Sequence, residues 1–346
     1  MSPRERWLAV LNRQEPDRLP LDYRATPEFS ARLMAHLGYE SMDRVFTRLH
    51  IDPVYDVGPR YVGPPLEPGK DVYGVGYADT RYHGGVYSDA VYHPLAEYNS
   101  VAEIEANYQW PSPDWWDYSV IPAQYAGHED QVIRGGHCEE FAMYKFLRGV
   151  QQGYLDLCDH PDIVDYCLGK LYDLKYEQIA RTYEQLPHGA IIWTWVAEDV
   201  STQRGLMISP DHIRRHFAPH YKRMIDLVHE GGGYVFHHSD GACREVVPLM
   251  IELGIDVLDP VQWRCAGMDR AGLKRDFGDQ VIFHGGMDNQ QTLPFGTVED
   301  CRREAFEDIA LLGPGLIYGP CHNLQVANPP ENVVAIYDAA YEAGGG

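Results

Sequence analysis

Side chains that bind metals or move protons follow several short apolar runs in this sequence. Four such runs lie at 234–241, 255–262, 281–288 and 316–323, and a segment with helical periodicity follows each of them. β-strands that are repeatedly followed by helices form a parallel sheet, and ligands of such sheets bind where the strands end. The sequence therefore predicts a functional site at these strand ends.

Three of these side chains have the chemistry of a metal site. His237 and His238 are adjacent, so in extended backbone they point to opposite faces, whereas His238 and Asp240 share one face. Cys321 ends the last run and adds a thiol. An imidazole, a carboxylate and a thiolate with a fourth position open form a usual catalytic zinc set. The alternative is a buried, inert cysteine and a histidine that only forms hydrogen bonds.

Other polar side chains are expected at the same edge of the sheet. Glu198 and Asp199 end a run that is too apolar to carry charges without a reason. For Glu139 and Glu140 we favour a role at a helix start, where acidic side chains cap or stabilise the helix dipole. The remaining candidates are Asp22, Arg24, Gln203, Arg204, His284, Asp288, His322 and Asn323.

The order of strands and helices predicts an α/β protein. Eight strands are expected at 18–23, 52–57, 131–136, 190–196, 234–238, 255–259, 281–285 and 316–320, with helical segments between most of them. This count fits a (β/α)8 TIM barrel, and we favour it over an open doubly wound sheet of similar length. Residues 1–346 are expected to form one barrel domain.

Residues 58–125 interrupt this rhythm. They are rich in Gly, Pro, Tyr and Trp and contain alternating runs, which predicts a β-hairpin or meander inserted after the second strand. An insertion at the carboxyl end of a barrel strand can form a wall or lid of the site. The alternative is a surface elaboration that only packs.

Composition narrows the class of protein. With 29 basic and 51 acidic side chains the formal charge is −22, which disfavours nucleic acid and anionic membranes as partners. The first residues are charged throughout, and no window approaches the length of a membrane span. Seven cysteines without a C-x-x-C pair predict reduced thiols. These features favour a cytoplasmic protein.

Several phrases of the sequence resemble the uroporphyrinogen decarboxylase (URO-D) superfamily. They are RERWLAVLNRQEPDRLPLDY near the start, EDVSTQRGLMISPDHIRRHFAPHYKRMIDLVHEGGGYVFHHSDG in the middle, and DVLDPVQ, FHGGMDNQQTLPFGT and GPCHNLQ towards the end. The resemblance spans nearly the whole chain and implies a (β/α)8 barrel. It also implies one of two activities, decarboxylation of a tetrapyrrole or zinc-dependent transfer of methyl groups involving a cobalamin-carrying protein.

The resemblance is nearer to the methyltransferase branch. Decarboxylases have an arginine-rich phrase near the start, of which Arg24 remains, and an aspartate to which Asp56 is a possible counterpart. Methyltransferases hold zinc with an H-x-C phrase and a later cysteine, which correspond to His238, Asp240 and Cys321. Aspartate in place of the first cysteine makes zinc more Lewis acidic, which favours an oxygen-bound methyl donor over a thiolate.

The resulting hypothesis is a zinc-dependent methyltransferase that moves a methyl group from a small O- or N-methyl compound to a corrinoid protein. Glu198 or Asp199 would supply a ligand or a proton, and His284 and Gln203 would orient the substrate. Arg24, His322 and Asn323 would also contact it. The alternatives are a metal-free decarboxylase that uses Arg24 and Asp56, and a non-catalytic binding barrel. The family resemblance allows a homodimer.

Overall fold

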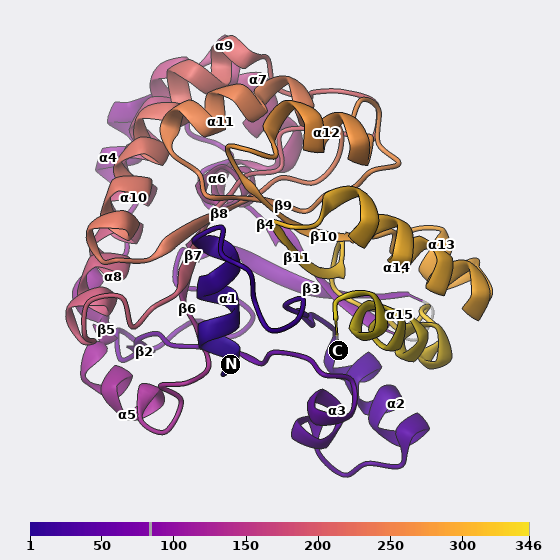
Figure 1. Ribbon diagram of the computed structural model, residues 1–346. Coiled ribbons are helices and arrows are strands. Elements are labelled where there is room, and N and C mark those ends of the chain that lie inside the picture. Colours follow the sequence, from indigo (N-terminus) through magenta and orange to yellow (C-terminus); the bar gives the residue numbers. More distant parts are fainter. Residues whose placement is uncertain (83–84, 346) are drawn as a thin grey trace.

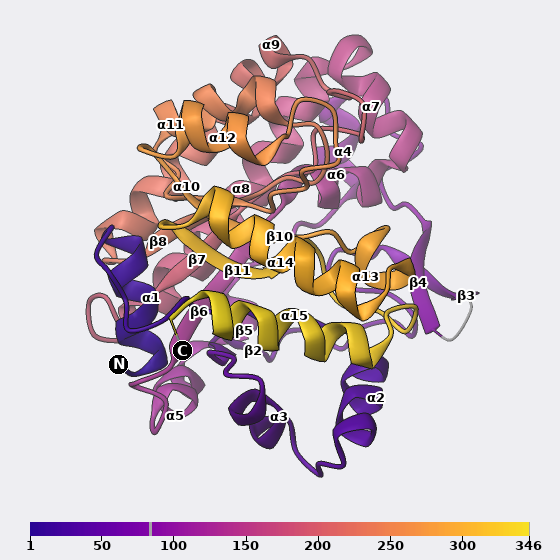
Figure 2. The same ribbon diagram turned by 45° about the vertical axis from the view of Figure 1, so that its right-hand side comes forward.

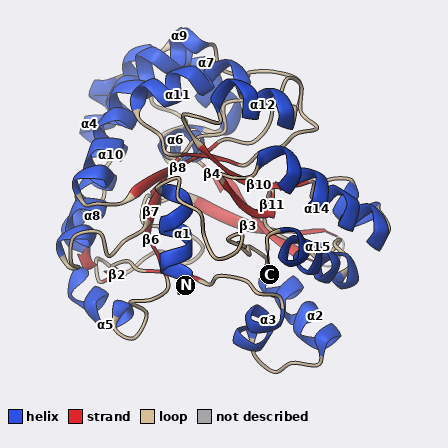
Figure 3. Ribbon diagram, in the orientation of Figure 1, coloured by secondary structure: helices blue, strands red, loops and turns tan. Residues whose placement is uncertain are grey.

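A curved parallel sheet forms the centre of the molecule, which is described by a computed structural model over residues 1–82 and 85–345. Figure 1 and Figure 3 show the strands inside a ring of helices. Seven strands pair in the order β1 (Val54–Asp56), β6 (Val132–Cys138), β7 (Trp193–Val196), β8 (Tyr234–His238), β9 (Val257–Asp259), β10 (Ile282–Met287) and β11 (Leu316–Pro320).

The segment around Leu21 takes the eighth position between β11 and β1. Leu21 forms a parallel bridge with Tyr318, and the N–H of Asp52 donates to the Leu21 carbonyl at 2.9 Å. The prediction of a full strand over 18–23 is wrong in extent, because only Leu21 has bridge geometry there. Pro20 has no N–H to donate to a ladder, which explains the shortened pairing. The barrel fold itself is confirmed.

The inside of the barrel is filled by one apolar layer. Inward side chains of six strands form it, together with Trp7 of α1 (Pro3–Leu11): Val132, Trp193, Phe236, Val257, Ile282 and Ile317. Trp7 is fully buried and stacks on Trp193 and Phe236, with ring centroids 6.4 and 6.0 Å apart. Helix α1 therefore closes the amino-terminal end of the barrel, and the opposite end is left for a site.

Helices surround the sheet on its outer face (Figure 2). Gly149 divides the helical segment that follows β6 into two helices. The helices that follow the barrel strands are α6 (Glu140–Arg148), α7 (Val150–Asp159), α8 (Pro161–Glu184), α9 (Pro210–His212), α10 (Ala218–Glu230), α11 (Val247–Leu253), α12 (Arg270–Phe277), α13 (Thr292–Phe295), α14 (Val298–Leu312) and α15 (Pro330–Ala343). A π-helical turn at Ile213–Phe217 joins α9 to α10.

The insertion after the second barrel strand is β-rich, as predicted. It contains the antiparallel pairs β2 (Arg60–Tyr61) with β5 (Trp116–Asp117) and β3 (Gly76–Tyr82) with β4 (Gly85–Tyr92), and the helices α4 (Val101–Asn107) and α5 (Ile121–Tyr125). Helices α2 (Pro27–Leu37) and α3 (Met42–Arg48) stand before β1. Among the described residues no helix is both long and apolar enough to cross a bilayer.

Candidate active site

A cavity of about 350 Å³ opens at the carboxyl ends of β6, β7 and β8. Its lining includes five residues expected from the sequence, namely Arg24, Asp199, His238, His322 and Asn323, and four that were not expected as site residues, namely His137, Glu139, Trp195 and Ala197. The lining contains no residue of the 58–125 insertion. A lid role for the insertion therefore stays a prediction.

A polar layer lies directly above the apolar layer of the barrel. Side chains alternate along a strand, so residues two positions apart face the same side. Trp195, His238, Asp259 and His284 each follow an apolar inward residue by two positions on β7, β8, β9 and β10. The pairing of His238 with Asp259, and of Phe283 with Leu258, brings these side chains to one level.

Asp259 is the centre of this layer. Its carboxylate is fully buried and accepts hydrogen bonds from Arg24 Nη2 (3.1 Å), Trp195 Nε1 (3.0 Å), His238 Nδ1 (3.0 Å) and His284 Nδ1 (2.6 Å). Burial opposes its charge, but Arg24 and His284 outweigh that effect and hold the pKa of Asp259 well below its ordinary value. The sequence reading did not identify Asp259 as a site residue.

His284 lies behind the cavity, between two carboxylates. Its Nδ1 donates to Asp259 and its Nε2 donates to Asp22 Oδ2 at 3.0 Å, so both ring nitrogens carry protons. Burial works against this charge, yet the two aspartates raise the pKa of His284. Neither ring nitrogen is left for a substrate, so the orienting role predicted for His284 would act through Asp259.

His238 joins this network to the cavity. Its Nδ1 donates to Asp259, so Nε2 faces the cavity, 3.8 Å from Asp240 Oδ1 and 3.9 Å from Asp199 Oδ1. Burial lowers the pKa of His238, but the hydrogen bond and the charge of Asp259 raise it to about 9. A carboxylate that fixes one imidazole nitrogen and leaves the other facing a site is the usual second shell of a metal-binding histidine.

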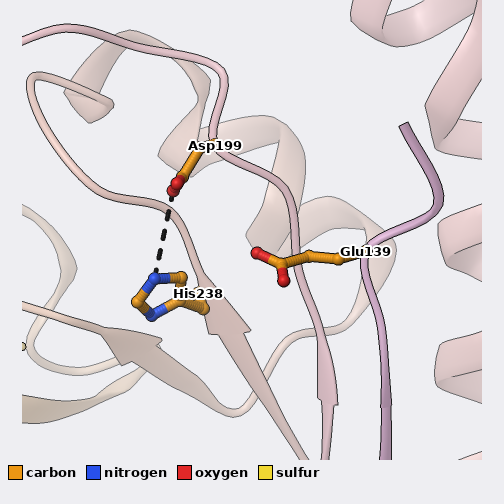
Figure 4. Close-up of side chains that lie close together, drawn as sticks. All are labelled: Glu139, Asp199 and His238. Carbon is orange, nitrogen blue, oxygen red and sulfur yellow. Dashed lines mark ion pairs between the residues drawn. The ribbon is translucent and has the colours of Figure 1, made fainter. Parts of the chain in front are cut away.

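Two more carboxylates approach His238. One ligand atom each of Glu139, Asp199 and His238 lies within 4.8 Å of the other two, and Figure 4 shows the three side chains turned towards a common space. Asp199 is held by the N–H of Asp240, which donates to Oδ1 at 2.8 Å. Burial and the neighbouring Asp199 raise the pKa of Glu139, against the opposing charge of His238.

Glu198 leaves the Glu139 carboxylate free to face the cavity, because Glu198 occupies the N–H groups at the start of α6. We expected Glu139 to cap a helix or to stabilise its dipole. Glu139 stands at the N-cap of α6 without a side-chain capping bond, so capping is wrong, and the dipole interaction stays a prediction. Glu198 Oε2 instead accepts the N–H groups of Phe141 (2.8 Å) and Ala142 (3.1 Å) at the start of that helix. Burial raises the pKa of Glu198 to about 8.

Cys321 does not line the cavity that contains His238. Its Sγ donates to the Val261 carbonyl at 3.0 Å, and burial raises the pKa of the thiol well above its ordinary value. It borders a separate recess that also contains Gln262 and Cys265. Among the described residues, the set His238, Asp240 and Cys321 is not among the close ligand groups, whereas Glu139, Asp199 and His238 are.

Comparison with known proteins shows the family to which this chain belongs. A family model described as uroporphyrinogen decarboxylase (URO-D) matches residues 148–343, more than half of the chain. The chain belongs to the uroporphyrinogen decarboxylase family. It is also similar in structure to a methyltransferase from Methanosarcina mazei, with 16% identity, 99% of each chain covered and a TM-score of 0.70. That likeness shows the fold. No curated protein matches the sequence.

Two further residues predicted for this family member lie outside the cavity lining. Asp56 is on β1, with a side chain 62% exposed, and accepts from Arg134 Nη2 at 2.6 Å. Gln203 Nε2 donates to Gln290 Oε1 at 2.7 Å. Arg24, which does line the cavity, is already paired with Asp259 and lies 3.7 Å from Asp22. The cavity thus has little free positive charge.

The residues present fit a divalent metal ion of the kind that the resemblance implies. His238 offers a fixed imidazole nitrogen, and the carboxylates of Glu139 and Asp199 lie within reach of the same point. Imidazole and carboxylate are both ordinary ligands of zinc and other first-row ions. Because the Cys321 thiol lies outside this group, the possible ligand atoms are one imidazole nitrogen and carboxylate oxygens.

Proposed function

We propose that this URO-D family protein is a metal-dependent methyltransferase that moves a methyl group from a small O- or N-methyl compound to a corrinoid protein. The observation that carries the proposal is His238, whose Nδ1 is held by Asp259 while Nε2 faces two carboxylates in the cavity. Family membership and the similarity of fold to a methyltransferase support the same class of reaction.

His238 would hold the ion together with carboxylates of the cavity, and zinc is the ion that the resemblance implies. When bound, such an ion supplies Lewis acidity to the heteroatom that carries the methyl group. Asp259 fixes the orientation of the imidazole, because Arg24, Trp195 and His284 hold the carboxylate in turn. Preorganisation of this kind removes the cost of arranging ligands during the reaction.

The cavity walls suit a small substrate. A volume of about 350 Å³ lies at the lower end of the range for small-molecule pockets. Trp195 presents an apolar surface, and Asn323 has a buried Oδ1 with no hydrogen-bond partner among the described residues. His322 Nε2 stands 3.9 Å from Asp240 Oδ2. These groups would orient the methyl donor, as predicted for His322 and Asn323.

His137 is a candidate for moving the proton of the reaction. It lines the cavity, and none of the described residues forms a hydrogen bond with its ring. In methyl transfer, the reduced cobalt of the acceptor supplies the electron pair of the new carbon–cobalt bond. The heteroatom leaves with the electron pair of the old bond and takes up a proton. Burial lowers the pKa of His137 to about 4, so near pH 7 its imidazole is neutral and would relay a proton from solvent to the leaving atom, not donate a stored one.

The decarboxylase alternative draws little support from the cavity. Several substrate carboxylates would need several cationic partners, since a buried unpaired charge is costly. Arg24 is the lining's one guanidinium, and Asp259 already occupies it. Asp56 is ion-paired with Arg134 outside the lining. A non-catalytic binding barrel has no specific observation in its favour.

A methyl-transfer assay tests the proposal. The purified protein is given zinc, reduced cobalamin and a panel of methoxylated and N-methylated compounds, and methylcobalamin is followed by its absorption. We expect formation with at least one donor and loss of at least about 100-fold in rate in His238→Ala. The control is His36→Ala, which removes an exposed imidazole on α2, outside the cavity lining. Release of carbon dioxide from uroporphyrinogen, unchanged in His238→Ala, would contradict the proposal.

A further inference from the structure

We infer that the metal ion of this protein is held by Glu139, Asp199 and His238, in nitrogen and oxygen coordination without Cys321. The inference rests on the proposed function for the role of the ion, but the binding group itself follows from geometry. Its members come from the ends of three successive strands, since Glu139 follows β6, Asp199 follows β7 and His238 ends β8. Figure 4 shows their polar atoms converging.

Distances select this group over the one expected from the sequence. The ligand atoms of Glu139, Asp199 and His238 all lie within 4.8 Å of one another, so small side-chain movements bring them to a common ion. Cys321 would first have to break its contact with the Val261 carbonyl and leave its own recess. The Asp240 carboxylate, 3.8 Å from His238 Nε2, is the nearest further donor, and Gln262 Nε2 already donates to its Oδ1 at 2.9 Å.

The carboxylates of Glu139, Asp199 and Asp240 share a cationic neighbour, the imidazole of His238, so a divalent ion that replaces its Nε2 proton would balance their charge more fully. Among the described residues, no lysine or arginine forms an ion pair with Glu139, Asp199 or Asp240. The lysines nearby are engaged elsewhere, Lys145 with Glu198 at 3.7 Å and Lys175 with Glu140 at 3.9 Å.

A buried carboxylate also lies behind the group. Glu198 is fully buried, and its Oε1 has no hydrogen-bond partner among the described residues but lies 3.7 Å from Lys145 Nζ. Burial raises the pKa of this carboxyl group, and the charges of Glu139 and Asp199 raise it further, whereas Lys145 opposes them. A divalent ion beside Asp199 would reduce this repulsion between the clustered carboxylates.

The donor set narrows the class of substrate. Carboxylate oxygens donate less electron density than thiolates, so an ion bound by them is a harder and stronger Lewis acid. Such an ion would favour an oxygen leaving atom, which would keep the electron pair of the broken carbon–oxygen bond, take up a proton and be released as an alcohol or phenol. We therefore assign an O-methyl compound, a methyl ether or methanol-like donor, to this cavity in preference to a thioether.

Cobalt substitution tests the ligand assignment directly. Metal-free full-length protein is titrated with Co²⁺ and followed by absorption spectroscopy, with the bound metal counted by elemental analysis. We expect one Co²⁺ per chain and no sulfur-to-cobalt charge-transfer band. Cys321→Ser should bind Co²⁺ like the wild type, and Glu139→Gln should bind it at least about tenfold more weakly. Glu140→Gln is the matched control, since its carboxylate faces Lys175 and should leave binding unchanged.

Other results of these experiments would contradict the metal ligands, the proposed function or the substrate class separately. A sulfur-to-cobalt band that disappears in Cys321→Ser, with Glu139→Gln unaffected, would overturn the inference in favour of the thiolate site. No Co²⁺ bound by the folded wild type would also overturn it. Binding as expected, but no methylcobalamin from any donor, would contradict the proposed function and leave the metal site standing. Methylcobalamin formed from a thioether and not from any ether would overturn the substrate assignment.

Discussion

Two clusters of charged side chains meet at His238, and they differ in how their carboxylates are satisfied. In the Asp259 network, formed by Asp22, Arg24, Trp195, His238, Asp259 and His284, each carboxylate faces cationic or N–H donors. In the carboxylate rim, formed by Glu139, Asp199 and Asp240, the described residues provide no lysine or arginine ion pair. Carboxylates are therefore neutralised in the Asp259 network, whereas in the carboxylate rim they lie close to one another.

This difference suggests two roles: the Asp259 network positions His238, and the carboxylate rim binds a cation. A buried network with all its hydrogen bonds made is rigid and stabilises the fold, because loss of one partner leaves other buried charges exposed to a low dielectric. A rim of like charges does not stabilise the fold and gains free energy when a cation arrives. Variants in the two clusters should accordingly have opposite effects on stability and on metal binding.

The largest expected effect is from Asp259→Ala. This variant leaves Arg24, His238 and His284 without their shared carboxylate, so we expect the free energy of unfolding to fall by about 3–5 kcal/mol. Urea unfolding measures it. In the rim, Asp199→Ala removes one accepted N–H bond and should change the free energy of unfolding by about 1 kcal/mol or less. Equal losses in the two variants would abolish the distinction between the clusters.

Metal addition should give the next largest effect, and it should reverse the order of stability of the wild type and Glu139→Gln. At a Zn²⁺ concentration about 100 times its Kd, the free energy of unfolding of the wild type should rise by about 2.7 kcal/mol. Glu139→Gln should gain less at the same concentration. In chelator-treated protein, however, Glu139→Gln should be at least as stable as the wild type, because burial and, after it, the repulsion with Asp199 disfavour the Glu139 charge by more than His238 favours it.

Thermal unfolding with and without zinc checks this reversal. Glu140→Gln is the control, because it removes the same charge from the adjacent residue. A wild type that zinc does not stabilise would show that the rim binds no such ion. A metal-free Glu139→Gln protein that is clearly less stable than the wild type would assign the rim a structural role.

The fold could be predicted because its signals are local. Apolar runs that end in polar residues marked seven of the eight barrel positions, and periodicity two correctly separated His237 from His238. His237 is buried, with its Nδ1 bonded to the Val196 carbonyl, while His238 faces the cavity. The first strand was overestimated because the shortening imposed by Pro20 depends on the ladder that it faces.

The site could be predicted only in part because its remaining determinants are not local. Asp259 becomes a hub through its register with His238 across β8 and β9, which the sequence does not reveal. Glu139 is freed because Glu198, 59 positions later, accepts the N–H groups at the start of α6. The orientation of Cys321 depends on a carbonyl 60 residues away. A rule that treats every acidic residue after a strand as a candidate would have retained Glu139.

Trp195 offers a smaller test of the Asp259 network. Trp195→Phe removes the indole N–H that donates to Asp259 and keeps an aromatic wall, at an expected cost of about 1–2 kcal/mol. A double-mutant cycle with Asp259→Asn isolates the pair and should give a coupling energy of similar size. The same cycle with Trp193→Phe should give a coupling near zero, since the Trp193 indole N–H has no hydrogen-bond partner in the described structure. Similar couplings in both cycles would remove Trp195 from the network.

The smallest effect on stability should come from a carboxylate that accepts several hydrogen bonds but is exposed to solvent. Asp300, in the first turn of α14, accepts from the N–H and hydroxyl of Thr297 and from Arg303 Nη2, and these bonds lower the pKa of Asp300 to about 2. A lowered carboxyl pKa contributes stability that is present above its unfolded value and is lost as the pH falls through the folded value. Solvent screening keeps that contribution small. Asp300→Asn should therefore lower the melting temperature slightly at pH 7, and its difference from the wild type should narrow between pH 5 and pH 3. The difference in melting temperature could instead be as large as that of Asp259→Ala, or could widen as the pH falls. Either result would show that burial does not account for the large contribution of the Asp259 network to stability.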